Sequence, residues 1–318
     1  MDVLRKKKIL ITGGCGFIGS HLCKIFLEKN YYVICVDNFI TGSKENVEEF
    51  LNNSNFRLIN HDISSPLYLS DKIDWVFHFA SLASPSYYLK YPIKTLKSGV
   101  LGTYNCLGIA KEKKVNFFLA STSEVYGDPQ IHPQQEEYNG NVSITGPRSC
   151  YDESKRAAES LTYAYMRQHN LDVRVARIFN TYGPKMRIDD GRVVSNFIVQ
   201  ALRGEDLTVY GEGLQTRSFC YIDDLIRGVL KMMEVDYKMP INLGNPQEVR
   251  IIDLAHLILK LTGSSSKIKF LPLPEDDPKK RKPDIKKAKE ILNWQPQVSL
   301  EEGLKKTIEY FKEKIKNA

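Results

Sequence analysis

The chain has 318 residues, of which 42% are hydrophobic and 26% are charged, and its formal net charge is +7. This length accommodates one large α/β domain and a smaller lobe, and the composition is that of an ordinary globular protein. No apolar run approaches the ~20 residues that cross a bilayer. The basic start leads into a strand-like run that contains glycines, which does not match a signal peptide. We therefore expect a soluble, cytoplasmic protein with no membrane partner.

The charge and the cysteines exclude further classes of protein. The lysines are spread over amphipathic patterns and both chain ends, whereas nucleic-acid-binding proteins usually concentrate basic residues in a stripe. We expect a site for an anionic ligand and no nucleic-acid partner. The cysteines lack CxxC spacing and nearby histidine clusters, which argues against a metal site and a disulfide framework. We expect most of them to be small core residues; they are Cys15, Cys23, Cys35, Cys106, Cys150 and Cys220.

The first half of the chain alternates short β-rich runs with helical patterns. The β-rich runs are apolar on both faces, as is typical of a parallel sheet covered by helices. This alternation predicts a doubly wound α/β fold with right-handed crossovers. The expected strands are 7–14, 31–38, 56–63, 74–80, 115–122 and 172–183, and the helical segments include 17–30, 94–114 and 151–170.

The regular alternation of strands and helices ends after Gly183-Pro184. Shorter elements follow, then a loop rich in charge and proline at 271–284 and a final amphipathic helix at 299–318. We predict a dinucleotide-binding domain over 1–183. We assign 184–318 mainly to a smaller substrate-binding lobe, with some segments returning to the first domain.

A glycine-rich turn joins the first strand to the first helix. Gly13, Gly16 and Gly19 lie in the stretch TGGCGFIG. Such glycines allow a tight turn and close approach of the backbone to a pyrophosphate, which sits at the positive end of the helix. A glycine triplet alone is weak evidence for a dinucleotide-binding site, but its position between a strand and a helix removes most false matches. Phe17 and Ile18 complete the predicted contact.

Acidic residues at the next two strand ends indicate which dinucleotide binds. Asp37 closes the second strand, eighteen residues beyond Gly19. A carboxylate there accepts hydrogen bonds from the ribose hydroxyls of NAD and repels the 2′-phosphate of NADP. The alternative is a simple turn residue. We predict NAD as the cofactor, with Asn38 beside Asp37 and with Asp62 and Ile63 near the adenine.

Three further residues form a candidate hydride-transfer set. Tyr151 and Lys155 are four apart on a predicted helix, so their side chains share one face. A free tyrosine has a pKa of about 10, and a neighbouring ammonium group is expected to lower it. Thr122 ends the fifth strand, at the edge where ligands bind in such sheets. As a bare pattern the Tyr-x-x-x-Lys pair is usually a surface pair, and it gains meaning from the preceding dinucleotide-binding half.

Longer motifs identify the chain as similar to a known family. The stretches TGGCGFIG, ASTSEVYG, YDESK and RIFNTYGP resemble the extended short-chain dehydrogenase/reductase family that acts on nucleotide sugars. The resemblance covers nearly the whole chain and is greatest to the UDP-glucuronate decarboxylase branch. It implies a Rossmann-type sheet with a C-terminal substrate lobe and a bound, recycled NAD. The implied reaction converts UDP-glucuronate to UDP-xylose through a UDP-4-keto sugar.

Two positions carry the resemblance to this branch. Related 4,6-dehydratases have an Asp-Glu pair after the threonine, whereas this chain has Ser123-Glu124, so the acid for water loss is missing. Arg281, in KRKPD, matches a loop from which an arginine reaches the substrate. By resemblance, Glu124 and Arg281 position the sugar and assist proton movement at C5. Which of them, or a water, protonates C5 stays open.

The resemblance also implies substrate contacts and an assembly. Bidentate arginines suit phosphates and carboxylates. Helices that include 94–114 and 151–170 resemble those that pair in a four-helix interface, so a homodimer is expected. The implied substrate-binding residues, besides Arg281, are Ser84, Tyr88, Arg148, Asn180, Arg192, Tyr210 and Arg217.

Other functions are weighed against this one. A UDP-sugar 4-epimerase or a nucleotide-sugar 4,6-dehydratase would share the fold and the cofactor. A regulator that only binds NAD or a nucleotide sugar would have no use for a poised base such as Tyr151.

Overall fold

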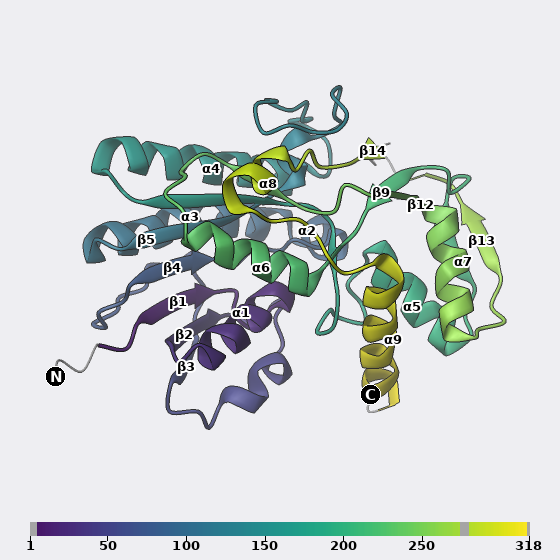
Figure 1. Cartoon of the computed structure of the whole chain (residues 1–318), viewed down its shortest axis with the longest axis horizontal. Helices are drawn as coiled ribbons and strands as arrows, with labels where there is room; N and C mark the ends of the chain where they lie inside the picture. The colour runs from purple at the N-terminus through teal and green to yellow at the C-terminus, as the bar shows by residue number, and fades with distance from the viewer. Residues whose placement is uncertain (1–4, 274–279, 317–318) are drawn as a thin grey trace.

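A seven-stranded parallel sheet forms the centre of the protein, as the computed structural model shows for residues 5–273 and 280–316 (Figure 1). The strand order is β11-β6-β5-β4-β1-β2-β3, and every pairing in this sheet is parallel. The doubly wound fold predicted from the apolar runs is therefore confirmed. The strands are β1 (Lys8–Thr12), β2 (Tyr32–Asp37), β3 (Phe56–Asn60), β4 (Trp75–His78), β5 (Asn116–Thr122), β6 (Val173–Ile178) and β11 (Ile241–Leu243).

Both faces of the inner sheet are buried, which explains why strands such as β1, β2, β4 and β5 are mostly apolar. Successive side chains of a strand point to opposite faces. On β1, Ile9 and Ile11 belong to one hydrophobic cluster and Leu10 to another. Helices α1 (Phe17–Glu28) and α6 (Ile222–Met233) cover the first face, and the paired helices α3 (Pro92–Lys113) and α4 (Ser149–His169) cover the second.

The second half of the chain builds the smaller lobe and also returns to the sheet. In the lobe, α5 (Val193–Arg203), α7 (Ile251–Thr262) and α9 (Leu300–Lys316) pack together (Figure 1). Strand β11 extends the central sheet, and α8 (Lys286–Leu292) packs on β11 and α6. The boundary at residue 183 stays a prediction, and the last two residues of the helix predicted at 299–318 lie outside the described residues.

Short elements connect these layers. Strands β8 (Leu207–Tyr210) and β13 (Ile268–Leu271) pair in the lobe, and β7 (Thr181–Tyr182) pairs with β10 (Cys220–Tyr221). A three-stranded sheet contains β12 (Glu248–Arg250), β9 (Thr216–Ser218) and β14 (Lys280–Arg281). The remaining short helices are α2 (Pro85–Lys90) and the 3-10 turns η1 (Lys44–Phe50) and η2 (Ser123–Tyr126).

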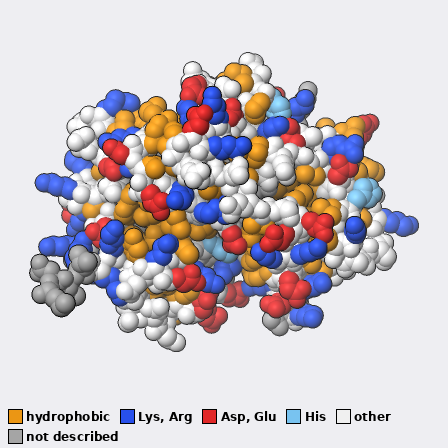
Figure 2. Space-filling model, in the orientation of Figure 1, with side chains coloured by type: hydrophobic (Ala, Val, Ile, Leu, Met, Phe, Trp, Pro, Cys, Tyr) orange, Lys and Arg blue, Asp and Glu red, His pale blue; other side chains and the backbone are white. Residues whose placement is uncertain are grey.

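The surface and the cysteines complete the description. On the face shown in Figure 2, lysine and arginine side chains are interspersed with aspartate and glutamate side chains. All six cysteines are buried and free, as expected of small core residues. Within residues 5–273 and 280–316, no helix has the length and apolar character needed to cross a membrane.

Candidate active site

The glycine-rich turn lies between β1 and α1, where two backbones approach closely. Gly13 has φ +72°, and a Cβ there would lie 2.7 Å from the backbone nitrogen of Ala80. A Cβ on Gly19 would collide with the carbonyl of Gly13. Helix α1 starts directly after Gly16, and no side chain caps its N-terminus. The N–H groups and positive dipole end of α1 therefore suit the binding of an anion such as a pyrophosphate.

Asp37 ends β2 beside this turn. Its carboxylate accepts hydrogen bonds from the backbone N–H of Cys15 (3.0 Å) and of Phe39 (2.9 Å). Burial raises the pKa of Asp37, and these backbone bonds oppose the rise. Asn38 and Ile63 line the same cavity as Asp37. The acidic strand end and the glycine turn together fit NAD, as the sequence predicts.

Asp62 lies differently from the other candidates. Its carboxylate pairs with Lys94 and accepts a hydrogen bond from the Ser64 hydroxyl (2.7 Å). Its neighbours His61 and Ile63 line the cavity, but Asp62 does not. A contact between Asp62 and the adenine stays a prediction.

One cavity of about 740 Å³ collects all the other candidates. It extends from the glycine turn, along the carboxyl ends of the parallel strands, to the smaller lobe. This is the edge at which open α/β sheets bind ligands. Besides the residues already described, it is lined by Phe17, Ile18, Ser84, Tyr88, Thr122, Glu124, Arg148, Tyr151, Lys155, Asn180, Arg192, Tyr210, Arg217 and Arg281.

Thr122, Tyr151 and Lys155 meet where β5 ends against α4. All three side chains are buried. The Lys155 ammonium donates to the Ala120 carbonyl (2.8 Å) and lies 5.9 Å from the centre of the Tyr151 ring. Thr122 forms a side-chain hydrogen bond with Tyr151. The helical spacing of four thus places the two titratable groups side by side, as expected.

The expected lowering of the pKa of Tyr151 is wrong in this structure. Burial raises this pKa, and the hydrogen bond with Thr122 offsets only part of the rise. Burial also lowers the pKa of Lys155 to about 8, against the opposing effect of Glu159. Desolvation disfavours both charged forms, which is why the two pKa values move in opposite directions.

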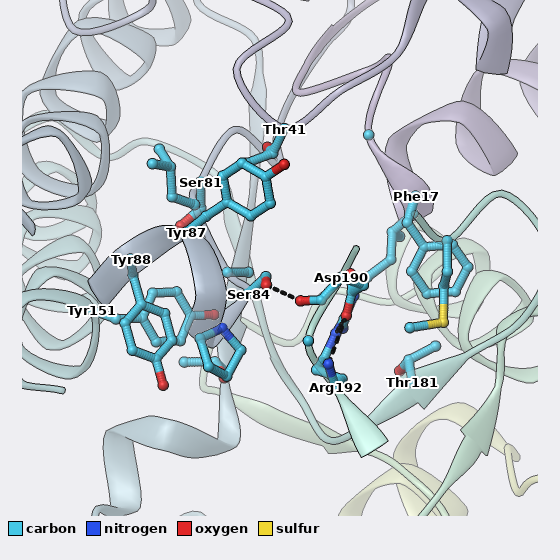
Figure 3. A pocket seen from close by; sticks show the side chains of 18 of the residues that line it. Phe17, Thr41, Ser81, Ser84, Tyr87, Tyr88, Tyr151, Thr181, Asp190 and Arg192 are labelled. Atoms are coloured by element: carbon cyan, nitrogen blue, oxygen red, sulfur yellow. Dashed lines mark hydrogen bonds and ion pairs between the residues drawn. The ribbon is translucent and has the colours of Figure 1, made fainter. Parts of the chain in front are cut away.

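A second tyrosine packs against Tyr151. The rings of Tyr88 and Tyr151 stack at 5.3 Å with an interplanar angle of 6° (Figure 3). Among the described residues, the buried Tyr88 hydroxyl has no hydrogen-bond partner. Since an unpaired buried donor is unfavourable, this hydroxyl is suited to a ligand atom.

Glu124 lies between two arginines from distant parts of the chain. One carboxylate oxygen is 2.5 Å from Arg148 Nη2 and 3.2 Å from Arg281 Nη2. Burial alone would raise the pKa of Glu124, but the charges of Arg281 and Arg148 outweigh it and hold the pKa at about 2. The carboxylate therefore stays ionised, and the cluster carries a net positive charge.

The loop before α5 brings Arg192 to the cavity. Asp190 pairs with Arg192 through both carboxylate oxygens, at 2.5 and 2.8 Å (Figure 3). The Ser84 hydroxyl donates to the backbone carbonyl of Asp190 and fixes the loop against α2. Arg217 donates to the Thr216 carbonyl (2.9 Å). The sequence prediction missed Asp190, although it stands only two residues before the predicted Arg192.

The tight approach at Gly19 gives a direct test of the cofactor site. We expect Gly19→Ala to weaken NAD binding by at least about tenfold, equivalent to about 1.4 kcal/mol, because its Cβ would push α1 from the turn. Gly108→Ala is the control, since a Cβ there meets open space. Calorimetric titration of nucleotide-free protein measures both. Equal affinities in the two variants would contradict the assignment.

Comparisons with known proteins agree with this geometry. The NAD dependent epimerase/dehydratase family matches residues 9–244. UDP-glucuronic acid decarboxylase 1 of Xenopus tropicalis is 56% identical over 312 residues, which are 98% of this chain and 74% of that protein. UDP-glucuronic acid decarboxylase 4 of Arabidopsis thaliana is 53% identical over 308 residues, which are 97% of this chain and 69% of that protein.

Solved structures show the same fold. The UDP-glucuronic acid 4-epimerase of Bacillus cereus, in complex with UDP-glucuronic acid and NAD, matches with a TM-score of 0.87 and 31% identity. That match covers 96% of this chain and 99% of the other. The UDP-glucose 4-epimerase of Thermotoga maritima, with UDP-glucose, also gives 0.87 and 31%, over 97% and 99%. The resemblance identified from the motifs is confirmed, and the chain belongs to the NAD dependent epimerase/dehydratase family.

Proposed function

We propose that the chain is an NAD-dependent UDP-glucuronate decarboxylase that forms UDP-xylose. Relatives that are 53–56% identical over nearly the whole of this chain carry that name. The observation that carries the proposal is the meeting of two groups of residues at one cavity. The hydride-transfer set of Thr122, Tyr151 and Lys155 lies beside the cluster of Glu124 with its two arginines.

The reaction requires a transient ketone. Direct loss of carbon dioxide from the sugar acid would leave an unstabilised carbanion at C5. Once the C4 hydroxyl is a ketone, the acid is a β-keto acid, and the electrons of the breaking bond pass into an enolate. A proton then adds to C5, and reduction of the ketone at C4 gives the xylose. The site must therefore move a proton at O4 and hold the carboxylate end.

Tyr151 is the base for the C4 hydroxyl, and Thr122 hydrogen-bonds the same oxygen. NAD, held by the glycine turn and Asp37, would supply the acceptor and donor of the C4 hydride, and its positive charge would favour the tyrosine phenolate. Lys155 contributes an ammonium charge close to the Tyr151 ring. The same Tyr151 then returns its proton to O4 as the ketone is reduced.

The carboxylate of the sugar fits the arginine cluster. Arg148 and Arg281 share one carboxylate partner, Glu124, so the cluster holds one positive charge in excess. The unpaired Tyr88 hydroxyl offers a further donor nearby, since the Arg148 guanidinium lies 5.9 Å from the centre of its ring. On the nucleotide side, we assign Arg192 and Arg217 to the diphosphate and uridine, with Ser84, Asn180 and Tyr210 as further contacts at the cavity wall.

A 4-epimerase is the second candidate. It is favoured by the fold match to the UDP-glucuronic acid 4-epimerase of Bacillus cereus. The same oxidation at C4 would serve it, and the ketone would be reduced on the opposite face without loss of carbon dioxide. Product analysis separates the two functions.

The first test is product formation by wild-type protein and by Tyr151→Phe. With UDP-glucuronate and NAD, we expect the wild type to release carbon dioxide and UDP-xylose, measured by mass spectrometry. Tyr151→Phe keeps the ring stack but loses the base, so kcat should fall by about 10²- to 10⁴-fold. Tyr68→Phe, at an exposed tyrosine, is the matched control. UDP-galacturonate as the sole product would refute the proposal in favour of the epimerase.

The pKa of Lys155 predicts a pH dependence. Burial lowers this pKa to about 8, so the ammonium form prevails below that pH and is lost above it. We expect kcat/KM to fall as the pH rises through about 8, measured from about pH 6.5 to 9.5, because kcat/KM reports the groups of the enzyme before substrate binds. A Lys155→Arg variant keeps its charge and should lack this alkaline decline, whatever its absolute rate. An identical decline in that variant would assign the titration to another group.

A homodimer is proposed from helices α3 and α4. Helix α3 exposes large apolar side chains, including Ile93, Leu101 and Tyr104, and contiguous exposed apolar surface is typical of interaction sites. We expect a dimer at micromolar concentration in sedimentation experiments, and Leu101→Glu should shift it toward monomer. The control is Leu214→Glu, at an exposed leucine outside these helices. A wild-type monomer would refute the dimer.

A further inference from the structure

Arg281 reaches the site from a segment distant in sequence. It lies on β14, which pairs with β9, and its side chain is only 2% exposed. Its guanidinium donates to the carbonyls of Ser123 and Gly127 and pairs with Glu124. These partners all belong to η2 or follow it directly. The position of Arg281 therefore depends on how residues 280–284 are held relative to η2.

Gln134 holds the segment that follows Arg281. Its backbone N–H donates to the Lys282 carbonyl (2.9 Å), and its own carbonyl accepts from the Asp284 N–H (2.8 Å). Its side-chain oxygen accepts from the Lys282 N–H (2.8 Å), and its side-chain nitrogen donates to the Ile131 carbonyl (2.9 Å). Gln134 is fully buried, so each of these bonds replaces one that water would otherwise make.

Asn242 connects Gln134 to η2. Its side-chain nitrogen donates to the carbonyls of Gln134 (3.0 Å) and Asp284 (3.1 Å). Its side-chain oxygen accepts from the Tyr126 hydroxyl (2.8 Å), and Tyr126 is the last residue of η2. Asn242 lies on β11 in the central sheet and is fully buried. The sheet thus anchors both η2 and the Arg281 segment.

These bonds close a ring. It runs from η2 through Tyr126, Asn242 and Gln134 to Lys282, and Arg281 then returns to η2 through its guanidinium. Neither Gln134 nor Asn242 lines the large cavity. A role in direct substrate contact is thus not indicated for either residue, and their effect must pass through Arg281 and Glu124.

We propose that Gln134 and Asn242 are positioning residues that fix the Arg281 guanidinium against Glu124 at the reacting end of the sugar. The inference rests on the proposed decarboxylase function. Loosening the ring leaves Thr122, Tyr151 and Lys155 in place, so oxidation at C4 continues. The sugar is then held less firmly after carbon dioxide leaves, and the ketone escapes before it is reduced. Each ketone that escapes leaves one NAD reduced to NADH. The assay must therefore contain enough NAD to replace it.

Gln134→Met tests this role, because methionine keeps the side-chain length but loses the amide. We expect kcat to fall by about 10- to 100-fold, since a misplacement of about 1 Å costs up to about 100-fold. We also expect the ratio of UDP-4-keto-pentose to UDP-xylose to rise by about tenfold. Mass spectrometry of the products measures this ratio, which does not depend on how much of the protein is folded.

Two further variants keep the test decisive. Gln200→Met is the matched control, because the Gln200 amide makes the same kinds of hydrogen bond elsewhere. Its oxygen accepts from the Thr208 N–H, and its nitrogen donates to the Thr208 hydroxyl. Tyr126→Phe removes only the hydroxyl that reaches Asn242 and Arg177. It should raise the ratio of UDP-4-keto-pentose to UDP-xylose by a smaller factor. If Gln134→Met does not fold, Tyr126→Phe alone tests the positioning role.

The outcomes separate the two proposals. If the wild type releases carbon dioxide while both ring variants keep its product ratio, the positioning role is refuted and the function stands. If the wild type releases no carbon dioxide, the proposed function fails and the positioning role fails with it. An increased ratio in the ring variants, with Gln200→Met unchanged, supports the inference.

Discussion

The charge of Glu124 constrains the whole active site. Only 15% of its side chain is exposed, so the carboxylate needs cations and donors in place of most of its water. Arg148 comes from the start of α4 and Arg281 from β14, and both reach the same carboxylate oxygen. The ion pair therefore joins the sheet domain to a segment near the C-terminus. Because Glu124 lies in η2, two residues after Thr122, it also fixes the cluster relative to the hydride-transfer set.

Burial governs the neighbouring pair in a different way. Tyr151 and Lys155 lie side by side, yet burial opposes the charged form of each, raising one pKa and lowering the other. Burial therefore favours the neutral form of both side chains. A cationic ligand bound in this cavity would favour the phenolate of Tyr151.

Local patterns in the sequence predicted the sheet and much of the cavity. Runs such as β1 are apolar on both faces because both faces are covered, and the strand ends fall at one edge because the strands are parallel. This places Gly13, Asp37 and Thr122 together without knowledge of tertiary contacts. Asp62 follows the end of β3 by two residues, but its pairing with Lys94 depends on the packing of α3. The predicted lowering of the pKa of Tyr151 was wrong for a related reason. Helical spacing shows that Tyr151 and Lys155 are close together, but not how deeply they are buried.

Long-range hydrogen bonds were outside the reach of sequence patterns, and they bear on what distinguishes a decarboxylase from an epimerase on one fold. Gln134 and Asn242 are 108 residues apart, and the sequence prediction gave neither residue a role. An epimerase must let the ketone turn so that its other face is reduced. Given the proposed function, the ring that fixes Arg281 opposes this rotation by holding the carboxylate end of the sugar. The difference in reaction would then arise from how firmly a cation is held rather than from a different set of oxidising residues.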